Sequence, residues 1–284
     1  MNLFSKFCGL FVLMAAGLSV PQALVAESLS FGVHPYKSPQ KLIKIYKPLV
    51  TLLSKRFNRP VKMVIAKDYA THIRNVGNDE LDIAYLGPAS YVRMVEQFGQ
   101  KRILARQAIK GSPTFQGKIV IRENSGITSI EQLKGKWFAF GDPNSTMSHL
   151  VQRSMLIDNG VTASSLNFNF IGSHDNVALG VLTGDYDAGA VKEAVYHKYK
   201  SKGLKVLATT EKLSEHLFVA SNTLSQKLVS DIGDALLELK NTHEGKTAMT
   251  SIKSGMTSML PATDTDYDNL RLMLKKLKDN NVIK

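Results

Sequence analysis

The residues with the clearest capacity for chemistry lie in one short segment, 141–150 (GDPNSTMSHL). Three of its side chains carry hydroxyl groups, those of Ser145, Thr146 and Ser148. The Asp-Pro pair before them ends a strand pattern, because the residue before a proline is kept out of the helical region. Asn144 or Ser145 can then cap a new helix. Hydroxyl donors and free N–H groups at the positive end of a helix form a cradle for an anion such as phosphate.

The same segment also fits a plain helix cap, in which one hydroxyl satisfies one free N–H group. Three hydroxyls are more than such a cap requires, and both interpretations stay open on this segment alone. The residues that follow repeat apolar positions at helical spacing and end at Asn159-Gly160, a common helix C-terminus.

The first 26 residues have the pattern of a secretory signal peptide. Lys6 supplies the positive start, residues 10–20 are mostly apolar but short for a membrane span, and Ala26 offers a cleavage point. An uncleaved anchor helix is the alternative. The only cysteine, Cys8, lies in this segment, so the mature chain is expected to lack disulfides and thiolate chemistry. These features predict a protein exported to a bacterial periplasm or outer surface, and we expect the periplasm.

The chain is basic, with 36 Lys and Arg against 24 Asp and Glu and a net charge of +12. Such a balance can attract nucleic acid. The lysines are scattered at helical spacings, however, and no basic run alternates with aromatic residues. We therefore expect no nucleic-acid partner and a basic surface that gathers small anions. With 44% apolar residues over 284 positions, the chain can bury the core of one large or two medium domains.

Strand and helix patterns alternate along the chain, which predicts an α/β fold with mostly parallel sheets. Each half has a strand, a polar loop, a helix and then a strand that begins Asp-Ile-Ala or Asp-Ala-Gly. This repeat predicts two α/β lobes that share a hinge and enclose a cleft. We place the first lobe at residues 27–121 plus 217–284 and the second at 122–216, with the polar break at 123–126 as the candidate crossing.

Aromatic residues follow the first and third predicted strands. Ligands of open α/β sheets bind beyond the carboxyl ends of the strands, so Tyr36, Tyr85 and Tyr91 are candidate ligand contacts. Tyr36 fits loop packing equally well, and one of the other two tyrosines could belong to the core.

Three segments resemble the phosphate, phosphite and phosphonate substrate-binding proteins of ABC transporters. They are 81–92 (LDIAYLGPASYV), 141–151 (GDPNSTMSHLV) and 173–181 (SHDNVALGV), in this order behind a signal peptide. The resemblance covers roughly residues 28–260. It implies a two-lobed type II periplasmic-binding-protein fold of the Venus flytrap kind, a monomer without a cofactor, a phosphorus oxyanion as ligand and a membrane permease as partner.

The resemblance also implies roles for single residues. Ser145 and Thr146 match the hydroxyl motif of the family, His174 matches its histidine, and Tyr85 stands at its aromatic position. If protonated, His174 would add a positive charge. Glu193 lies near the acidic position, where a carboxylate could accept the proton of a phosphate-like ion and so exclude sulfate. A solvated helix start is the other interpretation of Glu193.

The sequence departs from the family pattern at three positions. Met147 replaces the second serine of the motif, and Ser148 replaces a glycine. Ser148 could supply the missing hydroxyl, or Met147 could indicate a more apolar ligand. His216 stands where the family often has an acid, and we include it among the ligand contacts.

Two other classes of function are weighed. Ser145 and His174 could serve an enzyme as nucleophile and base, but the chain has no G-x-S-x-G motif and no cluster at metal-ligand spacing. We therefore expect neither catalysis nor a metal. A sensory module is the second alternative, because the same fold could present a ligand to a membrane receptor kinase. Ligand binding alone would not separate such a sensor from a transport protein.

Overall fold

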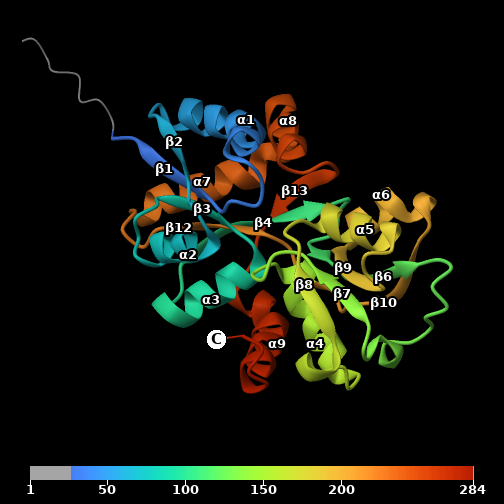
Figure 1. Cartoon of the computed structure of the whole chain (residues 1–284). Helices are drawn as coiled ribbons and strands as arrows, with labels where there is room; N and C mark the ends of the chain where they lie inside the picture. The colour runs from blue at the N-terminus through green and yellow to red at the C-terminus, as the bar shows by residue number, and fades with distance from the viewer. Residues whose placement is uncertain (1–26, 284) are drawn as a thin grey trace, which may run out of the picture.

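The computed structural model describes residues 27–283, so the expected signal peptide lies outside the described residues. These residues form two α/β lobes, each built on its own sheet (Figure 1). None of the helices in residues 27–283 has the length and apolar character needed to cross a membrane.

The first lobe contains a six-stranded sheet in the order β13-β4-β12-β3-β1-β2. Strands β1, β2 and β3 are parallel, whereas β12 runs antiparallel to β3 and β4, and β13 antiparallel to β4. The strands are β1 (Leu29–Val33), β2 (Val61–Ile65), β3 (Ile83–Leu86), β4 (Arg102–Ile109), β12 (Leu217–Ala220) and β13 (Met256–Leu260).

Helices cover both faces of this sheet. One face packs on α1 (Pro39–Phe57), α7 (Gln226–Leu237) and α8 (His243–Ile252), and the other on α2 (Tyr69–Gly77) and α3 (Pro88–Phe98). Helix α1 buries a stripe of apolar side chains against the sheet, Leu42, Tyr46, Leu49 and Leu53.

The second lobe contains a five-stranded sheet in the order β10-β6-β9-β7-β8. Strand β7 is parallel to β8 and β9, and β6 is antiparallel to β9 and β10. The strands are β6 (Gly117–Arg122), β7 (Trp137–Phe140), β8 (Asn167–Phe170), β9 (Ala188–Lys192) and β10 (Leu204–Thr209). One face packs on α4 (Val151–Asp158), and the other on α5 (His174–Thr183) and α6 (Glu193–Tyr199).

The two-lobed α/β fold is confirmed, but two details of the prediction are wrong. Both sheets are mixed rather than mostly parallel, because β6 and β12, which enter from the other lobe, run antiparallel to their neighbours, and β13 also runs antiparallel to β4. The predicted boundary at residue 121 would leave β6 in the first lobe, whereas β6 pairs with β9 and β10 of the second. The chain crosses earlier, near a two-stranded ribbon of β5 (Thr114–Phe115) and β11 (Leu213–Ser214).

Single helical turns complete the described chain. They are η1 (Glu131–Leu133), η3 (Ala163–Ser165), η4 (Lys200–Lys202), η5 (Glu238–Asn241) and η6 (Asp264–Tyr267), together with a π-helical turn, η2 (Thr146–Leu150).

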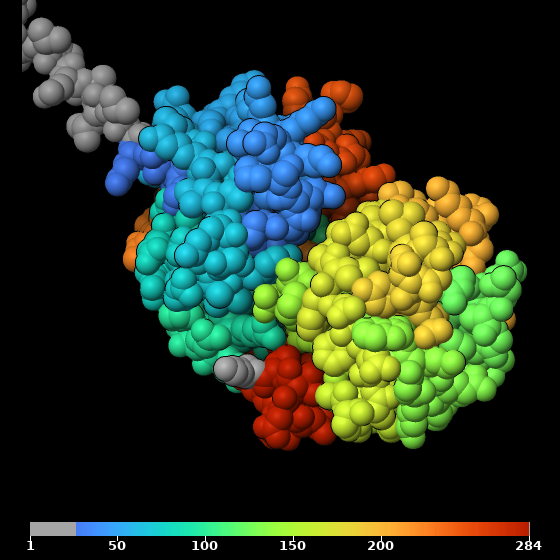
Figure 2. Space-filling model, in the orientation of Figure 1, coloured from blue at the N-terminus to red at the C-terminus, as the bar shows by residue number. Residues whose placement is uncertain are grey.

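The C-terminal helix α9 (Asp268–Asp279) contacts both lobes rather than the first lobe alone. It lies between α3 and α4, and Figure 2 shows it in red below the seam between the blue and cyan first lobe and the yellow and green second lobe. Lys278 pairs with Glu96 on α3, and Lys276 pairs with Asp158 on α4. The buried leucines of α9 belong to the same apolar cluster as Met147, Leu150 and Val151 of the second lobe.

We expect Leu274→Ala to destabilise the protein by about 2–5 kcal/mol, because this side chain is 3% exposed and its removal leaves a cavity in the cluster shared by the lobes. Urea denaturation followed by circular dichroism measures the change. Leu272→Ala is the matched control on the same helix, since Leu272 is 68% exposed, and its effect should stay within about 0.5 kcal/mol. Equal stability of the two variants would contradict the packing of α9 between the lobes.

Candidate functional site

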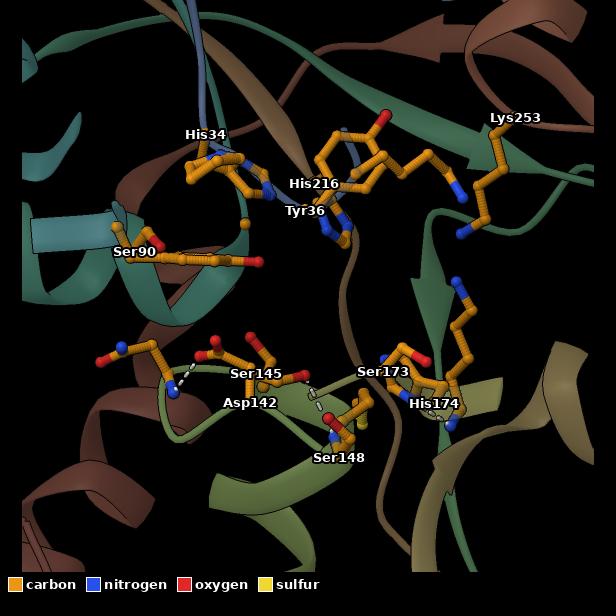
Figure 3. A pocket seen from close by; sticks show the side chains of 18 of the residues that line it. His34, Tyr36, Ser90, Asp142, Ser145, Ser148, Ser173, His174, His216 and Lys253 are labelled. Atoms are coloured by element: carbon orange, nitrogen blue, oxygen red, sulfur yellow. Dashed lines mark hydrogen bonds between the residues drawn. The ribbon is translucent and has the colours of Figure 1, made fainter. Parts of the chain in front are cut away.

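A cavity of about 410 Å³ lies between the two lobes. Its walls come from segments far apart in the sequence, including the loop after β1, the turn between β3 and α3, the segment after β7, the start of α5 and the end of α8. In Figure 3, the labelled side chains of the two lobes face each other across this space: His34, Tyr36, Ser90, His216 and Lys253 on one side, and Asp142, Ser145, Ser148, Ser173 and His174 on the other.

Residues 141–150, the hydroxyl segment, form a helix start on the cavity wall. Asp142 Oδ1 accepts the Asn144 backbone N–H at 2.7 Å, and Ser145 Oγ accepts the Ser148 N–H at 3.2 Å. The π-helical turn η2 follows and leads into α4. Ser148 Oγ is buried and has no hydrogen-bond partner among the described residues. A ligand oxygen in the cavity would supply one.

Thr146 connects this segment to the other lobe. Its Oγ1 accepts the backbone N–H of Ala89, in the first turn of α3, at 3.2 Å. Beside it, Arg93 Nη1 donates to Asn144 Oδ1 at 2.6 Å. The hydroxyl segment is therefore held against α3 in this state of the protein, and Thr146 retains its own proton as a donor.

Three helices begin at the cavity, and their free N–H groups give each start a partial positive charge. Gly87 and Ser90 place the start of α3 there, Ser145 the start of η2 and α4, and Ser173 the start of α5. Backbone N–H groups and hydroxyls from both lobes are thus concentrated around one space, which favours an anion over a neutral or cationic ligand.

His174 lies on the cavity wall as a neutral ring. The Lys192 backbone N–H donates to its Nδ1 at 3.1 Å, so the proton of the ring resides on Nε2. Burial, together with the nearby Lys192 charge, lowers the pKa of His174 to about 3. The positive charge considered from the sequence is therefore wrong for this state. His174 supplies an N–H donor instead.

His216 is held by an acid that the sequence did not single out. Its Nδ1 lies 2.9 Å from Glu215 Oε2 and donates to it. Burial lowers the pKa of His216 in spite of this partner, so the ring is neutral and its Nε2 is an acceptor. Burial alone would raise the pKa of Glu215, but hydrogen bonds from His216 and Lys253 hold it well below its usual range.

Tyr85 and Tyr36 line the cavity, but their hydroxyls are engaged within the first lobe. Tyr85 donates to Gln107 Oε1 at 3.4 Å, and the Tyr36 hydroxyl lies 3.1 Å from that of Tyr46. The Tyr85 ring lies nearly parallel to those of His34 and His216, at centroid distances of 5.5 and 5.4 Å, and the two histidine rings are 6.2 Å apart. These tyrosines therefore present ring surface to the cavity and shape its wall.

Two predicted site residues lie outside the cavity, each displaced by one position. Tyr91 is fully buried, and its hydroxyl donates to Asp264 at 2.8 Å, whereas its neighbour Ser90 lines the cavity. Glu193 is 41% exposed and pairs with Lys118 at 2.9 Å, whereas Lys192 before it lines the cavity. One step along α3 turns a side chain by about 100°, which places Ser90 and Tyr91 on different faces. Lys192 is the last residue of β9 and Glu193 the first of α6, and only the former faces the cavity.

Several residues on the wall were missed by the sequence reasoning. The main ones are His34, Tyr69, Lys37, Lys192 and Lys253. His34 and Lys37 flank Tyr36 in the loop after the first strand, so the position of that loop was an available signal. Lys253 gave no signal, because α8 brings it to the cavity from far along the chain. No group of three or more His, Cys, Asp or Glu side chains in residues 27–283 is arranged to hold a metal.

Comparison with known proteins agrees with this architecture. A phosphate-import protein from Mycolicibacterium smegmatis, PhnD, is 26% identical to the chain over 287 residues, which cover 90% of the chain and 89% of that relative.

Two solved structures share the fold. PhnD1 from Prochlorococcus marinus, in complex with methylphosphonate, superposes with a TM-score of 0.77 at 22% identity and covers 90% of this chain and 99% of its own. XAC2383 from Xanthomonas citri, bound to ATP, superposes with a TM-score of 0.78 at 18% identity and covers 89% and 98%.

Residues 31–267 match the protein family described as the phosphonate ABC transporter, periplasmic substrate-binding protein. That match spans most of the chain and includes every residue that lines the cavity. The chain therefore belongs to the periplasmic substrate-binding proteins of phosphonate ABC transporters.

Proposed function

We propose that the protein captures a small phosphorus oxyanion, a phosphonate, phosphite or phosphate, in the cavity between its lobes and delivers it to the membrane permease of an ABC importer. The observation that carries the proposal is the meeting of three helix starts with the Ser145, Ser148 and His174 donors at one cavity. Charge-assisted hydrogen bonds of this kind contribute about 1.5–3 kcal/mol each. The names of the M. smegmatis and P. marinus relatives support the same ligand class.

The proposed site also predicts a preference for phosphate-like ions over sulfate. Phosphate-like ions carry a proton near neutral pH, whereas sulfate does not. The neutral His216 ring leaves Nε2 free to accept that proton, in the role that the sequence reasoning gave to Glu193. Donors from the second lobe would then bind the unprotonated oxygens, and His216 the protonated one.

The cellular setting belongs to the same proposal. We propose that the mature protein works in the periplasm as a monomer after removal of its first 26 residues, without catalysing a reaction on the ligand. The family description names periplasmic substrate-binding proteins and so supports the location.

We expect His174→Ala to weaken methylphosphonate or phosphate binding at least about tenfold, since one charge-assisted hydrogen bond exceeds the roughly 1.4 kcal/mol that a tenfold change requires. Isothermal titration calorimetry on the protein from residue 27 onward measures it. His197→Ala is the matched control, because His197 is 56% exposed in the same lobe and outside the cavity. Unchanged affinity in a folded His174→Ala protein would contradict the site.

Ser148→Ala separates ligand binding from stability. Its buried hydroxyl has no partner among the described residues, so its removal should leave the melting temperature unchanged or slightly higher. The same change should weaken oxyanion binding about tenfold, because the ligand loses a donor. A variant that melts earlier yet binds normally would show that Ser148 serves packing and not the ligand.

His174 should keep its neutral form across the working pH range. Because its pKa is about 3, we expect the Nε2–H tautomer without ligand from pH 5 to pH 8. Nitrogen-15 NMR of labelled histidine, assigned by comparison with His174→Ala, distinguishes this tautomer from the imidazolium. A titration with its midpoint between pH 5 and 8 would contradict the proposed donor.

A further inference from the structure

One end of the cavity wall carries three lysines, Lys37, Lys192 and Lys253, which a small oxyanion at the hydroxyl segment does not use. They come from both lobes: Lys37 from the loop after β1, Lys253 from the end of α8, and Lys192 from the end of β9. In Figure 3 the Lys253 side chain reaches into the space opposite His174, on the far side of the view from Ser90.

The acids nearby neutralise only part of this charge. Glu215 Oε1 accepts from Lys253 Nζ at 2.6 Å. Asp175 is engaged by Lys198 and by the Tyr199 hydroxyl, the latter at 2.9 Å. No ion pair joins the ammonium of Lys192 to an acid anywhere in residues 27–283.

Lys37 likewise has no ion pair within residues 27–283, and its ammonium lies 5.8 Å from the ring centroid of Tyr36. The lysine end of the cavity therefore carries an excess of positive charge, with Lys37 exposed and Lys192 and Lys253 half-buried.

The charges of Lys37 and Lys253 repel the ammonium of Lys192. Burial, together with the charges of Lys253 and Lys37, lowers the pKa of Lys192 to about 8. A negative group placed between them would remove this repulsion and would at the same time connect the two lobes. Without such a group, like charges face each other across the seam.

We propose that the lysine end, Lys37, Lys192 and Lys253, binds a second anionic group of the ligand, so that the preferred ligand is a phosphorus oxyanion whose substituent carries a carboxylate or another phosphoryl group. The inference rests on the proposed function, because the first oxyanion occupies the hydroxyl segment and His174. A cavity of about 410 Å³ lies within the range of pockets that hold organic molecules and exceeds the need of one tetrahedral ion.

A ligand series tests this charge preference by calorimetry at pH 7. Methylphosphonate has a neutral substituent, 2-aminoethylphosphonate a cationic one, and 3-phosphonopropionate an anionic one of similar length. We expect 3-phosphonopropionate to bind at least tenfold more tightly than methylphosphonate, and 2-aminoethylphosphonate to bind more weakly than both. The affinities for methylenediphosphonate and ATP, compared with that for 3-phosphonopropionate, show whether the second anionic group is a phosphoryl group or a carboxylate.

Lys192→Met tests the residue at the centre of the proposal. It removes the charge but keeps the backbone N–H that donates to His174. We expect the ratio of the affinities for 3-phosphonopropionate and methylphosphonate to fall at least tenfold. Lys200→Met is the matched control, with the same charge change at an exposed position of the same lobe outside the cavity, and it should leave the ratio unchanged. Lys253→Met is avoided because it would leave Glu215 without its ammonium partner.

The outcomes separate the two proposals. If no phosphorus compound binds, the proposed function itself fails. If methylphosphonate binds and 3-phosphonopropionate binds no better, or if the ratio is unchanged in Lys192→Met, the second anionic group is refuted while the proposed function stands. If 2-aminoethylphosphonate binds more tightly than 3-phosphonopropionate, the preference for an anionic substituent is refuted as well.

Discussion

The free N–H groups of three helix starts need acceptors at the seam between the lobes, and this requirement organises the structure. A helix start leaves N–H groups that its own turns cannot satisfy. Here the starts of α3, η2 and α5 meet at one cavity, so the acceptors must come from capping side chains, from the opposite lobe or from a ligand. Thr146 already provides one acceptor across the seam. An oxyanion, with several oxygens in a small volume, provides several at once.

The second constraint is the free-energy cost of burying charge, which decides how the titratable groups around the cavity are used. A buried charge is tolerated only when it is paired and hydrogen-bonded. His174 and His216 therefore remain neutral, one as a donor and the other as an acceptor, and Glu215 keeps its charge because Gln107, His216 and Lys253 all donate to it. At the lysine end, Lys37 and Lys192 have no ion pair within residues 27–283, and the proposed second anionic group of the ligand would provide one.

The sequence predicted the parts of the site that depend on local order and missed those that depend on topology. Ser145 and Ser148 were found because strand, turn and helix follow one another in one segment. Tyr91 and Glu193 were each one residue away from the side chain that faces the cavity, since pattern reasoning located the helix starts but not their rotation. The strand β6 was assigned to the wrong lobe because its partners, β9 and β10, lie far along the chain and the local sequence does not identify them. The helix α8 and strand β13 were not predicted, so Lys253, which lies between them, was missed as a residue of the cavity wall.

Lobe motion is constrained differently at the two ends of the cavity. At the hydroxyl segment, the lobes share the apolar cluster of Met147, Leu150 and Val151 with α3 and α9, and Thr146 is bonded to Ala89. At the lysine end, no hydrogen bond or ion pair within residues 27–283 connects the side chain of Lys192 to the first lobe. Hinge closure around a ligand needs contacts that exist only in the closed state. An anion between Lys192 and Lys253 would be such a contact, so the second charge of the ligand would contribute to closure as well as to affinity.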